Sequence, residues 1–116
     1  MIFRTAPLKI HSCAISDVGL VRKNNEDAWG QLSEDRFFVL ADGMGGHNAG
    51  EIAAQESVKH LCKWREQIGA YYPGKMSCQE LCDLLEAALC VLNRSIYQMG
   101  LRKKDLKGMG TTICCL

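Results

Sequence analysis

Two short apolar runs, DAWGQL and RFFVLAD, are separated by the polar turn SEDR, and this arrangement constrains the fold more than any other feature. Both runs have the length of strands, and a short polar connection between such runs is typical of a β-hairpin. If the turn lies at the centre of the hairpin, Leu32 pairs with Phe37 and Gly30 pairs with Val39. The sequence therefore predicts a β-hairpin with a defined register.

This register places Asp27 opposite Asp42. Opposed residues of an antiparallel pair have Cβ atoms about 4.5–5.5 Å apart, and like charges there are destabilising. A slip of one residue would bring Glu26 onto that face instead, because neighbouring strand residues point to opposite faces. Either register sets one acid beside Asp42, so we expect a positive group between them. Carboxylates without nearby His or Cys ligands favour Mg²⁺ or Mn²⁺ over zinc.

The glycine-rich segment DGMGG begins at Asp42. Glycine adopts positive φ readily, which would let the main-chain carbonyl of Gly43 turn toward the same cation. Two other interpretations stay open: a flexible strand-to-helix turn with solvated acids, or a turn whose N–H groups bind an anion. Arg22, a few residues before the acids, can hold two phosphate oxygens through its planar guanidinium. A lone loop arginine is more often a surface charge, but with a cation it suggests a phosphate ester site.

The remaining segments predict an α+β fold. Alternation predicts a strand over residues 9–16, and helical spacing predicts helices from about Asn48 to Ala70 and from Ser77 to Gly100. Capping boxes are expected at Asn48 with Glu51 and at Ser77 with Glu80. The β-branched, apolar run 110–116 predicts a buried strand. Such an order favours an antiparallel sheet with an antiparallel helix pair over one face.

Composition restricts the function and the compartment. The 116 residues form one domain at most, and 14 Lys and Arg balance 13 Asp and Glu, so we expect no nucleic-acid or membrane partner. Seven cysteines without CxxC spacing, and no apolar signal segment, predict a reduced, cytoplasmic protein. The helical cysteines are expected to pack as small apolar residues: Cys62, Cys78, Cys82 and Cys90.

Three segments together resemble the first three motif blocks of the PPM-type, or type-2C, metal-dependent serine/threonine phosphatases in their bacterial form: GLVRKNNEDAW, FVLADGMGGHNAGEIAA and MGTTICCL. The match runs from about His11 to Leu116. It implies that residues 1–116 are a partial phosphatase domain, the first half of a four-layer α-β-β-α sandwich in which two antiparallel sheets are flanked by helix pairs.

The resemblance also implies roles for individual residues. Asp42 would bridge two Mn²⁺ or Mg²⁺ ions, Gly43 would offer its carbonyl to one of them, and Glu26 and Asp27 would hold metal-bound waters. Arg22 would bind the substrate phosphate, and a metal-activated water would attack phosphorus. His47 is the nearest candidate for the acid that protonates the leaving seryl or threonyl oxygen.

A role for His47 at the start of the helix is preferred, because eukaryotic relatives carry their histidine where this chain has Met44. The further aspartates that complete the family's metal site have no match here, so we expect weak metal binding and an activity that needs the second half. The alternatives are a noncatalytic remnant that binds phosphoproteins and a small interaction module with an accidental Asp-rich turn. The resemblance implies phosphorylated proteins as partners and a cytosolic role opposing serine/threonine kinases in bacterial signalling.

Overall fold

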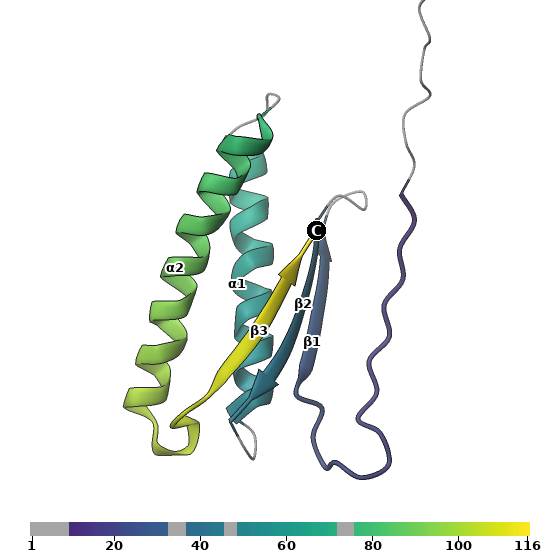
Figure 1. Cartoon of the computed structure of the whole chain (residues 1–116), viewed down its shortest axis with the longest axis vertical. Coiled ribbons are helices and arrows are strands. Elements are labelled where there is room, and N and C mark those ends of the chain that lie inside the picture. The colour runs from purple at the N-terminus through teal and green to yellow at the C-terminus, as the bar shows by residue number, and fades with distance from the viewer. Residues whose placement is uncertain (1–9, 33–36, 46–48, 72–75) are drawn as a thin grey trace, which may run out of the picture.

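The computed structural model describes residues 10–32, 37–45, 49–71 and 76–116. Three antiparallel strands form one sheet in the order β1-β2-β3, with a helix pair on one side of it (Figure 1). The elements in chain order are β1 Asp27–Leu32, β2 Phe37–Met44, α1 Ala49–Tyr71, α2 Cys78–Arg102, the 3-10 turn η1 Lys104–Leu106, and β3 Gly110–Cys115. Within the described ranges, neither long helix is apolar enough to cross a membrane.

The register of the hairpin is the one that the sequence predicts. Leu32 lies opposite Phe37, and Gly30 lies opposite Val39. The residues of the turn SEDR itself lie outside the described residues. Side chains of β2 alternate between buried and more exposed positions, so the sheet has an inner face under the helices and an outer face without them.

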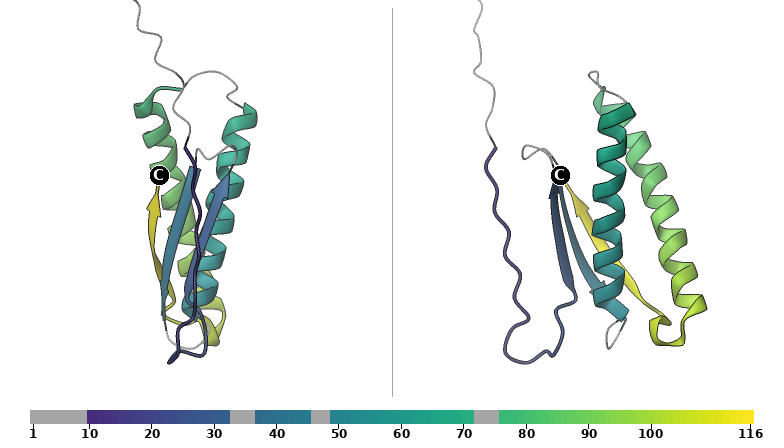
Figure 2. Two further views of the ribbon diagram at one scale, coloured as in Figure 1. Left: turned by 90° about the vertical axis from the view of Figure 1, so that its right-hand side faces the viewer. Right: turned by 180° about the vertical axis from the view of Figure 1, so that it is seen from behind.

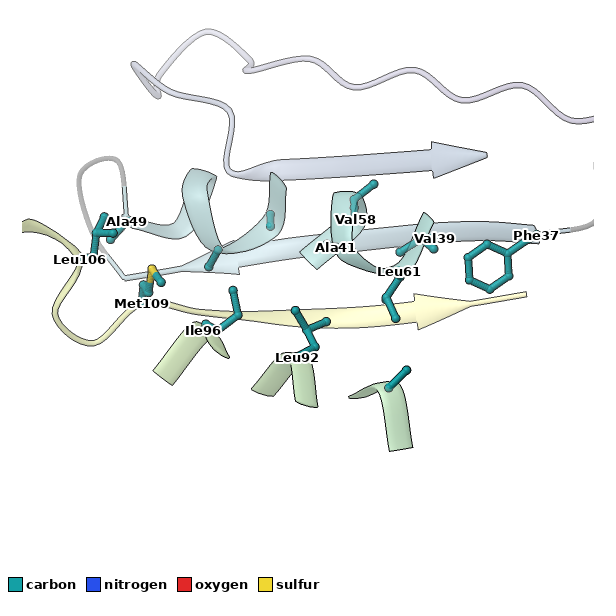
Figure 3. Close-up of a cluster of buried hydrophobic side chains, with 13 residues drawn as sticks. Phe37, Val39, Ala41, Ala49, Val58, Leu61, Leu92, Ile96, Leu106 and Met109 are labelled. Carbon is teal, nitrogen blue, oxygen red and sulfur yellow. The ribbon is translucent and has the colours of Figure 1, made fainter. Parts of the chain in front are cut away.

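The core lies between the inner face of the sheet and the helix pair (Figure 3). Val39 and Ala41 of β2 are buried beneath Leu61 of α1, while Leu92 of α2 packs against the side of the cluster. Gly30 allows α1 to approach closely, because a Cβ there would lie 2.7 Å from both Cys62 Sγ and Val58 Cγ1. Close packing of α1 against β1 therefore requires glycine at position 30.

The predicted capping box of α2 is present. Ser77 Oγ accepts a hydrogen bond from Glu80 N at 3.2 Å, and Ser77 N donates to Glu80 Oε2 at 2.9 Å. The expected helix end at Gly100 is wrong, since α2 continues to Arg102 and ends at the cap residue Lys103. Gly100 instead allows η1 to lie close to α2, because a Cβ at this position would lie 3.1 Å from the carbonyl oxygen of Leu106. Asn48, the expected cap of α1, lies outside the described residues.

Two strand predictions need correction. Residues 10–16 are exposed and form no strand, because the described sheet consists of β1, β2 and β3 and its ladder does not include this segment. The run 110–116 does form β3, but it is not buried throughout: Thr112 and Cys114 are exposed, while Thr111, Ile113 and Cys115 are half-buried. One face of β3 is covered by helices and the other is open.

Cysteine burial also differs from the expectation for the helices. Cys78, Cys82 and Cys90 are exposed on α2, and only Cys62 of α1 is half-buried. Burial, helped by the nearby Glu66 carboxylate, raises the pKa of the Cys62 thiol. Burial likewise raises the pKa of Cys115, with smaller contributions from neighbouring thiols. These two cysteines pack as apolar residues, whereas the three on α2 face solvent.

Candidate functional site

Two carboxylates lie on the outer face at one end of the sheet. Asp27 of β1 and Asp42 of β2 are partners in the register, and both side chains are exposed. Thr112 of β3 lies on the other side of Asp42 in the same row. Opposed positions in antiparallel strands hold Cβ atoms about 4.5–5.5 Å apart. The hairpin therefore brings two acids together without any help from the loops.

Glu26 takes a different direction from Asp27. Its carbonyl oxygen accepts a hydrogen bond from Gly43 N at 3.0 Å. Its carboxylate Oε2 is 2.9 Å from the position that a Cβ on Gly50 would occupy, so the side chain lies against the first turn of α1. A negative charge is favourable at a helix N-terminus. Of the two neighbouring acids, the register sets Asp27 beside Asp42, while Glu26 contacts the start of the helix.

The glycines at this end of the sheet are required for space. A Cβ on Gly43 would overlap the carbonyl oxygen of Gly50, and a Cβ on Gly50 would lie 2.9 Å from Gly43 C and from Met44 N. The expected use of positive φ at Gly43 is wrong: Gly43 lies within β2, and the nearby glycine with positive φ is Gly45, at 139°. Gly43 and Gly50 thus let β2 and α1 touch backbone to backbone.

Several polar residues hold the backbone at the two acids, and no individual role was predicted for them. Asn25 Oδ1 accepts a hydrogen bond from Asp27 N at 3.0 Å, and Asn25 Nδ2 donates to Ser16 Oγ at 2.7 Å. Thr111 Oγ1 donates to the backbone oxygen of Asp42 at 2.9 Å. Their only sequence signal was their place in the segments NNED and GTT. Asn25 and Thr111 position the backbone at the two acids.

The other predicted site residues are less constrained. Arg22 is exposed in the irregular segment before β1. Within the ranges that the structure covers, its guanidinium has no hydrogen bond or salt bridge and is available to an anion. His47 lies outside the described residues, so its predicted role as an acid or at the start of the helix stays a prediction.

The carboxylates of Asp27 and Asp42 are the kind of ligand that a hard divalent cation prefers, but they are only two. Carboxylate oxygens are the ligands that Mg²⁺ and Mn²⁺ prefer. Among the described residues, no group of three or more His, Cys, Asp or Glu side chains could hold a metal ion. We therefore expect Asp27 and Asp42 alone to bind such an ion only weakly, because affinity rises with the number of charged ligands.

The chain is similar to bacterial serine/threonine phosphatases in sequence and in fold, although no family model matches it. The phosphatase PstP of Mycobacterium tuberculosis is 38% identical over 109 residues, which are 94% of this chain and 19% of PstP. The solved Stp1 of Staphylococcus aureus superposes with a TM-score of 0.72 at 31% identity, over 87% of this chain and 39% of that one. The PstP catalytic domain in complex with two manganese ions gives 0.68 at 38% identity, over 87% and 40%.

The chain thus spans well under half the length of these relatives, from 19% of PstP to 41% of the Listeria innocua phosphatase Stp. Identity above 30% extends over most of this chain, and the matched structures share its sheet and helix pair. By sequence and by fold, the chain is similar to a part of the bacterial type-2C serine/threonine protein phosphatases.

Proposed function

We propose that this chain forms one part of a metal-dependent site that hydrolyses phosphoserine and phosphothreonine in proteins. The observation that carries the proposal is the register that sets Asp27 opposite Asp42 on the open face. Two like charges placed opposite each other by strand pairing repel, and a cation between them would remove this repulsion. The manganese ions bound to the matched PstP catalytic domain support Mn²⁺ as that cation, with Mg²⁺ as its alternative.

In this proposal each residue has a limited task. Asp42 and the carbonyl of Gly43 would hold the metal, and Asp27 and Glu26 would hold waters around it. Arg22 binds the phosphate through its guanidinium, and His47 is the candidate proton donor to the leaving oxygen. The divalent ions, when bound, supply an activated water and neutralise charge on the phosphoryl oxygens. Further acids outside this chain complete the site, and phosphorylated proteins in the cytoplasm, modified by serine/threonine kinases, are the substrates.

Phosphate release from a phosphothreonine peptide in Mn²⁺ tests the proposal. Activity should disappear with a chelator and with Asp42→Asn, because the direct ligand is lost. Asp105→Asn removes an exposed acid from η1, outside the proposed ligand set, and should leave activity unchanged. Metal-independent phosphate release, or equal loss in both variants, would refute the proposed role of Asp42.

The small donor set favours a second function, binding of phosphoproteins without hydrolysis. Two converging carboxylates hold a cation weakly, whereas the unpaired Arg22 guanidinium is available for a phosphate group. This function predicts that the chain binds a phosphothreonine peptide without releasing phosphate, and that Arg22→Lys weakens binding because the bidentate contact is lost. Release of phosphate would exclude it.

A further inference from the structure

The segment that follows α2 carries a concentrated positive charge. Residues 102–107 have the sequence RKKDLK, with four basic residues and one acid, whereas the charges of the whole chain nearly cancel. The four basic side chains, which we call the basic turn, belong to Arg102, Lys103, Lys104 and Lys107. All four are exposed, and within the part of the chain that the structure describes none of them forms an ion pair.

The backbone of the basic turn is firmly held. Leu106 and Met109 are 5% and 8% exposed, and they lie with Ala49 at one end of the core cluster (Figure 3). Leu106 N donates a hydrogen bond to Lys103 O at 3.0 Å, and Met109 N donates to Leu106 O at 3.1 Å. The positive charges are therefore presented on an ordered backbone, which reduces the entropy lost when a partner binds.

The basic turn lies at the end of the sheet that carries Asp42. A Cβ on Gly45 would lie 3.3 Å from the carbonyl oxygen of Gly108, just after the turn. Met44, two residues after Asp42, pairs with Gly110 at the start of β3. The end of β2, the start of α1 and the turn after α2 lie at one end of the molecule (Figure 2). The turn and the proposed metal site therefore share this end.

The backbone path between Asp42 and Lys107 limits their separation. It runs along β2 to Met44, across to the paired Gly110, and back three residues to Lys107. With about 3.8 Å between consecutive Cα atoms and about 5 Å between paired residues, the two Cα atoms are at most about 24 Å apart. An extended peptide advances about 3.4 Å per residue. A peptide with its phosphate at Asp42 therefore reaches the turn within about seven residues.

Helix stability explains only a part of the basic turn. Positive charges are favourable in the last turn of a helix, which accounts for Arg102 and for Lys103 at the cap. Lys104 and Lys107 lie beyond the end of α2, where this effect has fallen off. Like charges held close together repel one another, and an anion between them removes that repulsion. The two outer lysines are thus suited to an anionic partner.

We propose that the basic turn binds acidic side chains of a phosphoprotein substrate, several residues away from its phosphorylated serine or threonine. This inference rests on the proposed function of the site at Asp42 and narrows its substrates to phosphorylated segments with Asp or Glu on a flank. Lysine ammonium groups act as point charges with loose geometry, so the number of acids matters more than their exact positions. Salt should weaken the preference because the charges are exposed.

Binding of unphosphorylated peptides to the 116-residue chain in chelator tests the turn without the metal. One peptide carries glutamates about four to seven residues from a central threonine on each side, and its match carries glutamines there. An exposed ion pair contributes roughly two- to fivefold to affinity, so at low salt the glutamate peptide should bind at least about tenfold more tightly by fluorescence anisotropy. Lys104→Gln with Lys107→Gln should remove about fivefold or more of this preference, whereas Lys59→Gln with Lys63→Gln on α1 should not change it.

The phosphorylated forms of both peptides, assayed in Mn²⁺, separate this inference from the proposed hydrolysis. We expect a lower KM for the glutamate peptide at equal kcat, and the Lys104 and Lys107 changes should raise only that KM. Equal binding and equal KM of the two peptides would overturn the role of the turn and leave the hydrolysis intact. No phosphate release with a persistent preference for glutamate would refute the hydrolysis and support the turn.

A preference that the α1 variant weakens as much as the Lys104 and Lys107 variant also overturns the inference, because general positive charge would then explain it. The glutamine peptide is the suitable substrate for the Asp42→Asn comparison. It has no acids to contact the turn, so Asp105→Asn remains a control there.

Discussion

The opposed carboxylates predict that Asp42→Asn stabilises the metal-free chain. Asp27 and Asp42 are register partners with exposed side chains, so their Cβ atoms are about 5 Å apart and their carboxylates lie in a medium close to water. Two unit charges at about 5 Å repel by about 0.8 kcal/mol at that dielectric constant, and salt reduces this. We expect the free energy of unfolding to rise by about 0.5–0.8 kcal/mol in chelator, or a Tm higher by about 2–3 °C.

Urea unfolding in chelator and in excess Mn²⁺ measures this effect. Asp27→Asn should stabilise the apo chain by a similar amount, and the double variant should gain nothing more, because either change removes the same repulsion. In Mn²⁺ the order should reverse, since only the parent chain is stabilised by binding the ion. Additive effects of the two changes, or a loss of stability in chelator, would show that the carboxylates do not face each other.

Three further changes test the packing and the caps. Gly50→Ala should lower the free energy of unfolding by about 1–3 kcal/mol, because the new Cβ would lie 2.9 Å from the Gly43 backbone, and urea melts measure it. Ser57→Ala should raise it by about 1 kcal/mol, because the buried Ser57 hydroxyl has no hydrogen-bond partner. Ser77→Ala should cost about 1 kcal/mol through loss of the cap. Hydrogen bonds from the Ser77 backbone and side chain lower the pKa of Glu80. The stabilisation that comes from the charged Glu80 carboxylate is therefore fully present above the pKa of Glu80 in the unfolded chain. It is lost as pH falls through the lower pKa of Glu80 in the folded chain.

Each of these has a matched control or a decisive outcome. Gly69→Ala also changes a helical glycine of α1, but its Cβ would meet only the flexible end of Arg65 at 3.5 Å, so it should stabilise the chain by about 0.5–1 kcal/mol. Equal effects of the two glycine changes would refute the close contact at Gly50. A destabilised Ser57→Ala chain would mean that the hydroxyl has a partner. Thermal melts of the Ser77 variant from pH 7 to pH 3 should move closer to those of the parent chain without meeting them, because the hydrogen bond from Glu80 N to Ser77 Oγ does not depend on pH.

Sequence patterns predicted the structural elements that depend on residues lying close together in the chain. The register that pairs Asp27 with Asp42 followed from the length of two runs and one turn, because strand pairing across a short connection has few alternatives. The capping box at Ser77 was likewise visible in four consecutive residues. The resemblance to phosphatases rested on the same local segments, and the comparisons confirm it.

The contacts between distant segments could not be predicted in this way. The direction of the Glu26 side chain depends on Gly50, which lies across the turn at the start of α1. The place of Thr111 beside Asp42 depends on β3, whose sequence is separated from the hairpin by both helices. Gly100 resembled a residue that ends a helix, but in the structure its missing side chain leaves room for the carbonyl of Leu106.

The sequence by itself determined the periodicity of the strands and helices, and with it the pairing of two acids at one end of a hairpin. The tertiary structure decided which of those acids shares a face with Asp42. It also decided that Gly43 and Gly50 have no room for a side chain, and that segment 10–16 is not a strand. The physical reason is that periodicity depends on neighbours in the chain, whereas close packing and strand pairing depend on partners that the fold brings from elsewhere.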